Sequence, residues 1–364
     1  MLTQDFSTTK VTRWNRIVSG QETVEIGRTP KEAIYQRDIL TVYRFERETP
    51  ATQKHPILIA YSLINRPAVL DLLPGRSVVE RFLEAGFEVY LIDWGVPTAL
   101  DYHSGLDTYV NLYIRSAIRE TLKHSGSKEL HLFGYCMGGA LAAIATALRP
   151  RGIKSLTLLG TPLNFRSEEL LYRWSADPNV NKPEKLVEAW RVAPAWNFES
   201  FSLLTLDKKP DMLKALYNRL EDEGFVESYM AMERWVGDNI PMAASVFQEF
   251  VRGSFLNNDL YEGRMEVGGK KVDLGAIKVP VLSIIGEADH EESQSRDRTV
   301  GEHLERSARE SQGRHAAGDA DHRPDAEHHE AHVTDTAESD QPFKVRLPHS
   351  HHGSVDHANY RNYS

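Results

Sequence analysis

The sequence predicts an α/β fold in which a mostly parallel sheet forms the core. Short apolar, β-branched runs alternate along the chain with segments of helical spacing, which is typical of strands joined by crossover helices. The predicted strands are Ile57–Ala60, Val89–Asp93, Leu130–Phe133, Ser155–Leu159 and Val281–Ile285. Helical spacing of apolar residues covers Ser77–Ala85 and Leu106–His124. A chain of 364 residues is long enough to bury a large core.

Three of the predicted strands run into residues that suit a binding or catalytic site. Asp93-Trp94-Gly95 closes the second strand, and Gly286-Glu287-Ala288-Asp289-His290 follows the last one. The third strand continues into Gly134-Tyr135-Cys136-Met137-Gly138-Gly139. Because ligands of open α/β sheets gather outside the carboxyl ends of the strands, we expect the site at this edge of the sheet.

The strand that leads to Cys136 has the pattern of a nucleophile elbow. An apolar run, Gly-x-Cys-x-Gly-Gly and a small-residue helical pattern over Ala140 to Leu148 follow one another. Gly134, Gly138 and Gly139 supply the crowded positions that must lack a Cβ. Cys136 replaces the usual serine at the N-terminus of a helix, where the dipole favours a thiolate. The alternative is a buried core cysteine, but the glycines at these offsets favour a nucleophile and an α/β-hydrolase fold.

An inserted helical cap is expected between the predicted strands Ser155–Leu159 and Val281–Ile285. The alternation of strands and helices stops at Pro162, and aromatic residues at helical spacing follow as far as Phe255. Most of these aromatics are expected to form the core of the cap, and a few are candidates to line an acyl-binding tunnel. The predicted organisation is an N-terminal extension (1–30), a hydrolase core with the elbow (31–161), the helical cap (162–276), the last core strand with the catalytic acid (277–290), a disordered low-complexity segment (291–340) and a last strand with a histidine loop (341–364).

Composition and charge exclude several classes of protein. The net charge is −9 and no basic run is present, so nucleic acid is not expected as a partner. No apolar stretch approaches the roughly 20 residues of a transmembrane helix, and Met1–Lys10 lacks the apolar core of a signal peptide. Cys136 is the only cysteine, so the chain has no internal disulfide. These features together predict a cytoplasmic protein.

The segment 291–340 is predicted to be disordered and not to bind a metal. Its large apolar residues are only Val300, Leu304 and Val333, too few to offset the entropy cost of ordering. His328 and His332 lie four residues apart, which suits metal binding only in a helix. The segment offers neither cysteine partners nor apolar support for such a helix, so we predict no metal site.

A nucleophile elbow requires an acid and a histidine, which follow it in that order along the chain. Asp289 comes just after the last predicted strand and is the predicted acid; its alternative role is that of a turn or cap residue. His290 is too close to Asp289 in sequence to serve as the base. A later alternating segment, Phe343–Leu347, predicts one more strand. The base then comes from the loop after it, which contains His349, His351 and His352.

Five blocks of the chain together match a known family of proteins: Tyr61–Pro67, Val89–Gly95, Gly134–Gly139, Met232–Val236 and Gly269–Leu274. In these blocks the chain resembles the polyhydroxyalkanoate synthases, specifically the short, two-component kind. The resemblance runs from about Pro30 to His290, and a cysteine in the lipase-like box separates these synthases from serine lipases. Beyond His290 the chain departs from the family pattern. An extra low-complexity stretch, arising from a natural insertion or a disturbed reading frame, separates the acid from Pro348-x-x-His351-x-Gly353.

The resemblance implies acyl transfer from 3-hydroxyacyl-CoA to Cys136, with release of CoA and growth of a polyester. It implies His351 as the base, and Asp289 as the group that helps to activate the attacking hydroxyl. The oxyanion is expected on the backbone N–H of Met137 and on that of Leu63 or Ile64. No cofactor is implied, because the CoA thioester is the substrate. A second synthase subunit, homodimerisation and polymer granules in the cytoplasm are the implied partners and location.

Two other functions use the same residues. A thioesterase or depolymerase has the same constellation but admits water to the acyl-enzyme. An inactive chain that binds a partner or a granule follows if the segment after His290 fails to supply the catalytic histidine.

Overall fold

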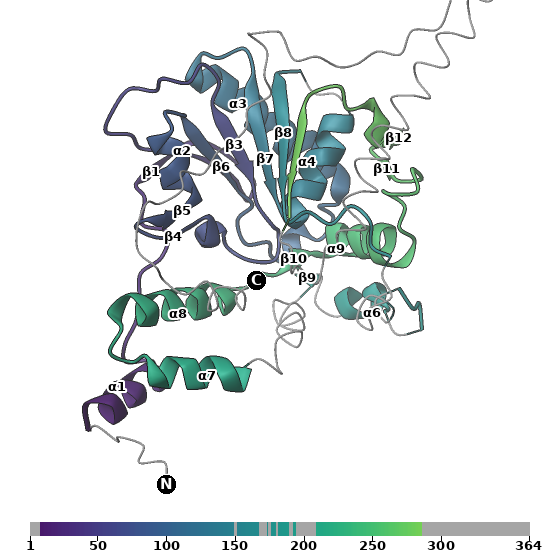
Figure 1. Cartoon of the computed structure of the whole chain (residues 1–364). Coiled ribbons are helices and arrows are strands. Elements are labelled where there is room, and N and C mark those ends of the chain that lie inside the picture. Colours follow the sequence, from purple (N-terminus) through teal and green to yellow (C-terminus); the bar gives the residue numbers. More distant parts are fainter. Residues whose placement is uncertain are drawn as a thin grey trace, which may run out of the picture. The chain divides into compact units, whose positions relative to one another are not determined.

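The computed structural model divides the chain into two compact units, Met1–Ile284 and Ile285–Ser364, and the first contains the described helices and strands (Figure 1). The described residues are 8–148, 151–166, 173, 176–179, 181–188, 192–193 and 209–285. The predicted low-complexity segment, the predicted strand Phe343–Leu347 and the histidine loop lie outside these residues.

In the described part of the chain, seven strands form the central sheet, in the order β1-β2-β6-β3-β7-β8-β13. They are β1 (Lys31–Arg37), β2 (Leu40–Phe45), β3 (Ile57–Ala60), β6 (Val89–Asp93), β7 (Leu130–Tyr135), β8 (Ile153–Leu159) and β13 (Val281–Ile284). The five strands from β6 to β13 in this order are mutually parallel. All five predicted strands are present with bounds within two residues of the prediction, so the mostly parallel sheet is confirmed.

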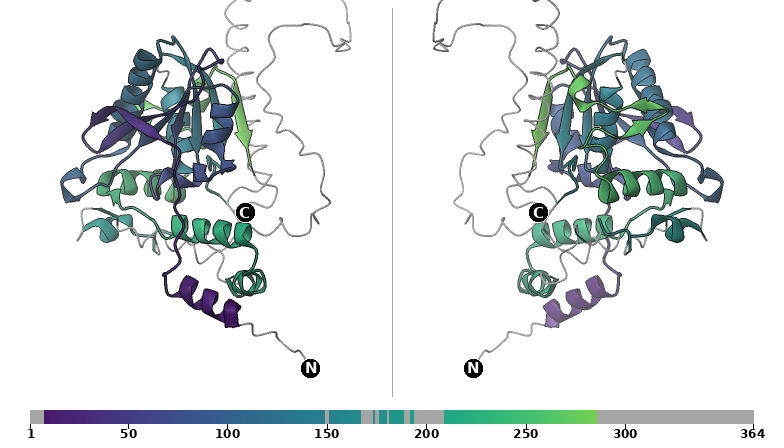
Figure 2. Two further views of the ribbon diagram at one scale, coloured as in Figure 1. Left: turned by 90° about the vertical axis from the view of Figure 1, so that its left-hand side faces the viewer. Right: turned by 90° about the vertical axis from the view of Figure 1, so that its right-hand side faces the viewer.

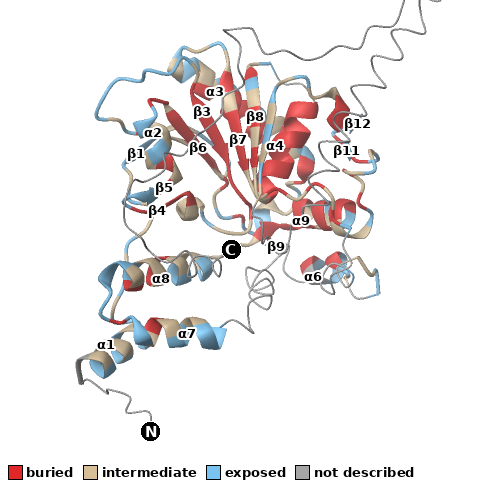
Figure 3. Ribbon diagram, viewed as in Figure 1, coloured by how far each residue is buried: buried red, intermediate tan, exposed pale blue. Residues whose placement is uncertain are grey.

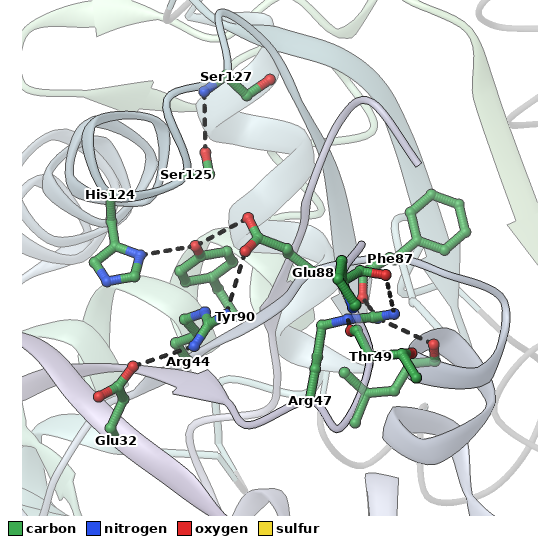
Figure 4. Close-up of polar contacts among 12 residues, drawn as sticks. Glu32, Arg44, Arg47, Thr49, Phe87, Glu88, Tyr90, His124, Ser125 and Ser127 are labelled. Atoms are coloured by element: carbon green, nitrogen blue, oxygen red, sulfur yellow. Dashed lines mark hydrogen bonds and ion pairs between the residues drawn. The ribbon is translucent and has the colours of Figure 1, made fainter. Parts of the chain in front are cut away.

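The first two strands, which the sequence analysis did not predict, extend the sheet as an antiparallel hairpin. Figure 4 shows how polar side chains attach this hairpin to the core. The Arg44 guanidinium on β2 lies 3.3 Å from a Glu32 carboxylate oxygen on β1 and 3.4 Å from one of Glu88, just before β6. The Tyr90 hydroxyl on β6 lies 2.9 Å from His124 Nδ1. These contacts connect β1, β2 and β6 to the helix that carries His124.

Helices pack on both faces of the sheet, and the alternation of side chains along β7 shows which helix covers which face. Gly134 faces α4 (Met137–Ala147), since a Cβ on it would contact Ala142. Phe133 points to the other face and its ring lies 5.4 Å from that of Phe82 in α2 (Val78–Glu84). The remaining core helices, η3 (Thr108–Ile114) and α3 (Arg115–Ser125), form one continuous helical segment. Figure 3 shows the central strands and α4 as the buried centre.

The segment between β8 and β13 contains the predicted cap helices. The described elements are α6 (Pro183–Glu188), β9 (Val192–Ala193), α7 (Lys209–Asn218), α8 (Glu223–Val236), β10 (Met242–Ala243), α9 (Ala244–Phe250), η5 (Val251–Leu256), β11 (Glu266–Val267), β12 (Lys270–Lys271) and η6 (Leu274–Ala276). Short elements elsewhere are η1 (Pro67–Leu70), β4 (Asp71–Leu73), β5 (Arg76–Ser77) and η2 (Ala99–Asp101).

Three aromatic residues of the cap pack around a buried cluster within it, in the position predicted for most of the cap aromatics. Tyr217, Phe225 and Tyr229 surround a cluster of buried residues that consists of Leu216, Leu220, Val226 and Met230. The N-terminal helix α1 (Thr8–Val18) joins this cluster through Trp14, and Figure 2 shows α1 beside α7. Arg13 also pairs with Glu223 at 2.6 Å. Within the described part of the chain, no helix has the length and apolar character needed to cross a bilayer.

One histidine of the sheet predicts a pH dependence of stability. Burial, followed by the charges of His55 and Lys154, lowers the pKa of His131 on β7 below 6.5. A lowered pKa in the folded state means that this histidine favours folding above pH 6.5, and that this contribution is lost as the pH falls through the folded-state pKa.

We expect the melting temperature to fall between about pH 7 and 5, and to fall less in His131→Gln, which cannot be protonated. Scanning calorimetry of both proteins across this range measures the difference. His103→Gln, on an exposed histidine, is the control. An identical pH dependence in His131→Gln and the wild type would exclude this role.

Candidate active site

The predicted turn between strand and helix is present, with Cys136 between the end of β7 and the start of α4. Its backbone has φ 53° and ψ −130°, a conformation that residues other than glycine adopt only with strain. The Cys136 N–H donates to the Leu159 carbonyl oxygen at 2.9 Å, and its own carbonyl oxygen accepts from the Gly139 N–H at 2.9 Å. These hydrogen bonds fix the turn against the end of β8.

The three glycines around Cys136 allow α4 to approach the sheet closely. A Cβ on Gly134 would overlap the Cα of Gly139, and a Cβ on Gly139 would overlap the side chain of Thr161. A Cβ on Gly138 would overlap the backbone carbonyl oxygens of Ala60 and Tyr61. The predicted crowding at these three glycines is confirmed, and the first turn of α4 lies directly against the chain that leaves β3.

The position of Cys136 gives it both access and a favourable electric field. Every residue of α4 is buried, whereas Cys136 at its N-terminus is partly exposed. The dipole of a helix stabilises a negative charge at its N-terminus by about 0.3–1 kcal/mol, and by more where the site is partly buried. A thiolate at Cys136 would gain this stabilisation at a residue that is not fully buried.

The loop after β3 contains the predicted oxyanion donors Leu63 and Ile64. Tyr61, Ser62 and Leu63 are buried, and the indole N–H of Trp94 donates to the Tyr61 carbonyl oxygen at 2.9 Å. Burial, with the nearby Asp93 charge, raises the pKa of Tyr61 well above 10, so its hydroxyl stays protonated. The loop that carries the predicted donors is thus anchored where it passes the first turn of α4, next to Met137.

The last strand ends at the same edge as the elbow. Tyr135 pairs with Leu159 across β7 and β8, and Leu159 pairs with Ile284 across β8 and β13. The Gly160 N–H also donates to the Ile284 carbonyl oxygen at 2.9 Å. The residues predicted to supply the acid and the base lie outside the described part of the chain, so their placement stays a prediction. They are Asp289, His349, His351 and His352.

Two residues at this edge were not assigned a role from the sequence. Trp94 anchors the loop after β3, and Thr161 fills the space that Gly139 leaves open. Trp94 could have been identified from the sequence, because it comes directly after a buried strand. The role of Thr161 is visible only in the packing of the folded chain. Among the described residues, no group of three or more His, Cys, Asp or Glu side chains forms a metal site. His328 and His332 lie outside those residues.

Comparison with known proteins identifies the family of this chain. A family model for the alpha/beta hydrolase fold matches residues 66–290. The poly(3-hydroxyalkanoate) polymerase subunit PhaC of Allochromatium vinosum is 33% identical over 282 residues, which cover 74% of this chain and 76% of that subunit. The chain belongs to the PhaC family of the alpha/beta hydrolase fold. The predicted α/β-hydrolase fold and the family resemblance inferred from the sequence are therefore confirmed.

Two other PhaC relatives are longer than this chain. The chain is 37% identical to the PhaC subunit of Haloferax mediterranei over 271 residues, and 37% identical to that of Haloarcula marismortui over 279 residues. It spans 55% and 58% of their respective lengths. The region matched by the fold family, 66–290, includes Cys136 and extends to Asp289.

The strain at Cys136 predicts that two substitutions of this residue differ in stability. Alanine keeps the unfavourable positive φ of 53°, whereas glycine adopts this conformation freely. We expect Cys136→Gly to be more stable than Cys136→Ala by about 1 kcal/mol, despite the greater flexibility of glycine in the unfolded chain. Urea unfolding of both variants measures this difference. The reverse order of stability would show that the turn at Cys136 is unstrained.

Proposed function

We propose that this chain is the catalytic subunit of a poly(3-hydroxyalkanoate) synthase. It would be an acyltransferase that polymerises 3-hydroxyacyl-CoA and releases CoA. The observation that carries the proposal is a partly exposed cysteine at the elbow of a PhaC-family chain. A cysteine suits this reaction because exchange of an acyl group between two sulfur atoms is close to isoenergetic, and a thiolate is intrinsically a strong nucleophile.

The first step loads the acyl group. The histidine base takes the proton from the Cys136 thiol, and the thiolate attacks the thioester carbonyl carbon. Negative charge develops on the carbonyl oxygen, where the N–H of Met137 and that of Leu63 or Ile64 would stabilise it. The tetrahedral intermediate collapses with cleavage of the bond to the CoA sulfur. CoA leaves as the thiol with the proton from the histidine.

The second step extends the polyester. The 3-hydroxyl group at the end of a chain attacks the acyl group on Cys136, forms an ester bond and regenerates the thiol. The hydroxyl must lose its proton as it attacks, and we assign this activation to Asp289 acting with the histidine. The support for Asp289 is its position five residues after Ile284, where β13 ends at the same edge of the sheet as Cys136.

The proposal also covers the partners and the location. The growing chain is insoluble, so the enzyme would work at the surface of polymer granules in the cytoplasm. A second synthase subunit and a second copy of this chain are the proposed protein partners. No cofactor is required, because the CoA thioester supplies the activated acyl group.

The activity is tested by incubating the chain, alone and with a second synthase subunit, with 3-hydroxybutyryl-CoA. Released CoA thiol and polymer are followed together. We expect both to form, and Cys136→Ser to lose at least about a thousandfold in rate, since replacing a triad nucleophile has effects of this size. CoA with free hydroxy acid but no polymer would identify a hydrolase, and wild-type rates in Cys136→Ser would overturn the proposal.

The roles of the acid and of the base are distinguished by measuring acylation and elongation independently. We expect Asp289→Asn to acylate Cys136 slowly and to lose elongation more severely. Of His349→Gln, His351→Gln and His352→Gln, only His351→Gln is expected to lose acylation by several orders of magnitude. Single-turnover CoA release reports acylation, and polymer length reports elongation. Normal elongation in Asp289→Asn would exclude Asp289 from the mechanism. Normal acylation in all three histidine variants would exclude His351 as the base.

A further inference from the structure

The loop after β3 is held at its far end by the cap. The segment that follows α8 runs antiparallel to this loop, with a bridge between Asn65 and Asn239. The Ile240 N–H donates to the Ile64 carbonyl oxygen at 3.0 Å. The helices of the cap therefore connect directly, through backbone hydrogen bonds, to the loop that carries the proposed oxyanion donors.

A tryptophan side chain adds a third connection. The indole N–H of Trp235, in the last turn of α8, donates to the Arg66 carbonyl oxygen at 2.9 Å. The ring packs against the buried cluster of Leu72, Leu73 and Ala231. This packing fixes the direction of the N–H. The nearby ion pair between Arg66 and Asp238, at 3.2 Å, has both side chains nearly half exposed, and exposed pairs contribute little.

The two ends of the loop are attached to different parts of the fold. At the start of the loop, Trp94 donates to the Tyr61 carbonyl oxygen from the end of β6. At its end, Trp235 donates to the Arg66 carbonyl oxygen from the cap. Leu63, between the two attachments, is 3% exposed. The backbone path between them is short, so a shift of the Arg66 attachment is transmitted to the N–H groups of Leu63 and Ile64.

We propose that Trp235 is a positioning residue that holds the oxyanion loop in place from the cap. The inference rests on the proposed function, since it concerns the same oxyanion site. Its physical basis is that a preorganised donor stabilises a developing oxyanion only within narrow limits of distance and direction. Trp235 touches no reacting atom in this account. It acts through the Arg66 carbonyl and the loop backbone.

Trp235→Phe tests the proposal because it removes the indole N–H and keeps an aromatic ring against Leu72 and Leu73. Trp14→Phe is the matched control, since Trp14 packs in the other cap cluster and its ring lies 5.7 Å from that of Tyr217. Three quantities are measured for both variants. They are single-turnover acylation of Cys136 by 3-hydroxybutyryl-CoA, alkylation of Cys136 by iodoacetamide, and hydrogen exchange of the peptide that covers residues 61–66.

We expect Trp235→Phe to slow acylation about tenfold, less than the hundredfold or more seen when an oxyanion donor is deleted. Alkylation should be unchanged, because displacement at a saturated carbon develops no oxyanion. Amide exchange over residues 61–66 should be faster than in the wild type. Trp14→Phe should match the wild type in all three measurements.

Wild-type acylation and wild-type exchange in Trp235→Phe would overturn the proposal. An equal loss of acylation and alkylation would also overturn it, because it would point to damage at Cys136 itself. If the wild type releases no CoA, the proposed function is wrong. The exchange of residues 61–66 in the two variants then still decides whether Trp235 holds the loop.

Discussion

The close contact between the first turn of α4 and the chain that leaves β3 is the constraint on which the rest of the site depends. Gly138 lies against the carbonyl oxygens of Ala60 and Tyr61, with no space for a Cβ. This contact places the N-terminus of a wholly buried helix at the carboxyl edge of the sheet. The backbone of Cys136, next to this contact, has a positive φ. Local strain at one residue thus accompanies an arrangement that brings Cys136, the N-terminus of α4 and the loop after β3 together.

Hydrogen bonds connect Cys136 and the loop after β3 to the neighbouring strands and to the cap. The Cys136 N–H is hydrogen-bonded to β8, and the end of β8 is in turn hydrogen-bonded to the end of β13. The loop after β3 is anchored by Trp94 from the core and by Trp235 from the cap. A change in the cap can therefore reach the loop with the proposed oxyanion donors. If the chain has the proposed polymerase activity, this connection would couple the position of the cap to acyl transfer.

The sequence predicted the parts of the fold that depend on local pattern. The strand bounds, the elbow at Cys136 and its three glycines follow from apolar runs and from the steric demands of a tight turn. The β1–β2 hairpin was missed because neither strand has a continuous apolar run, and β1 is mostly exposed. The contact between Trp235 and Arg66 was also beyond the sequence pattern, because its partners are 169 residues apart and meet only after the cap has folded. Asp289 and His351 remain predictions, since both lie outside the described residues.

The central claim is that Cys136 carries the acyl group, and peptide mass spectrometry tests it most directly. The protein is mixed with 3-hydroxybutyryl-CoA, quenched in acid within the first turnover and digested, and the peptide that contains Cys136 is weighed. The account predicts that this peptide gains the mass of one or more 3-hydroxybutyryl units, and that neutral hydroxylamine, which cleaves thioesters, removes the gain. An acyl group on any other residue, or CoA release that leaves the Cys136 peptide unmodified throughout, would contradict the account.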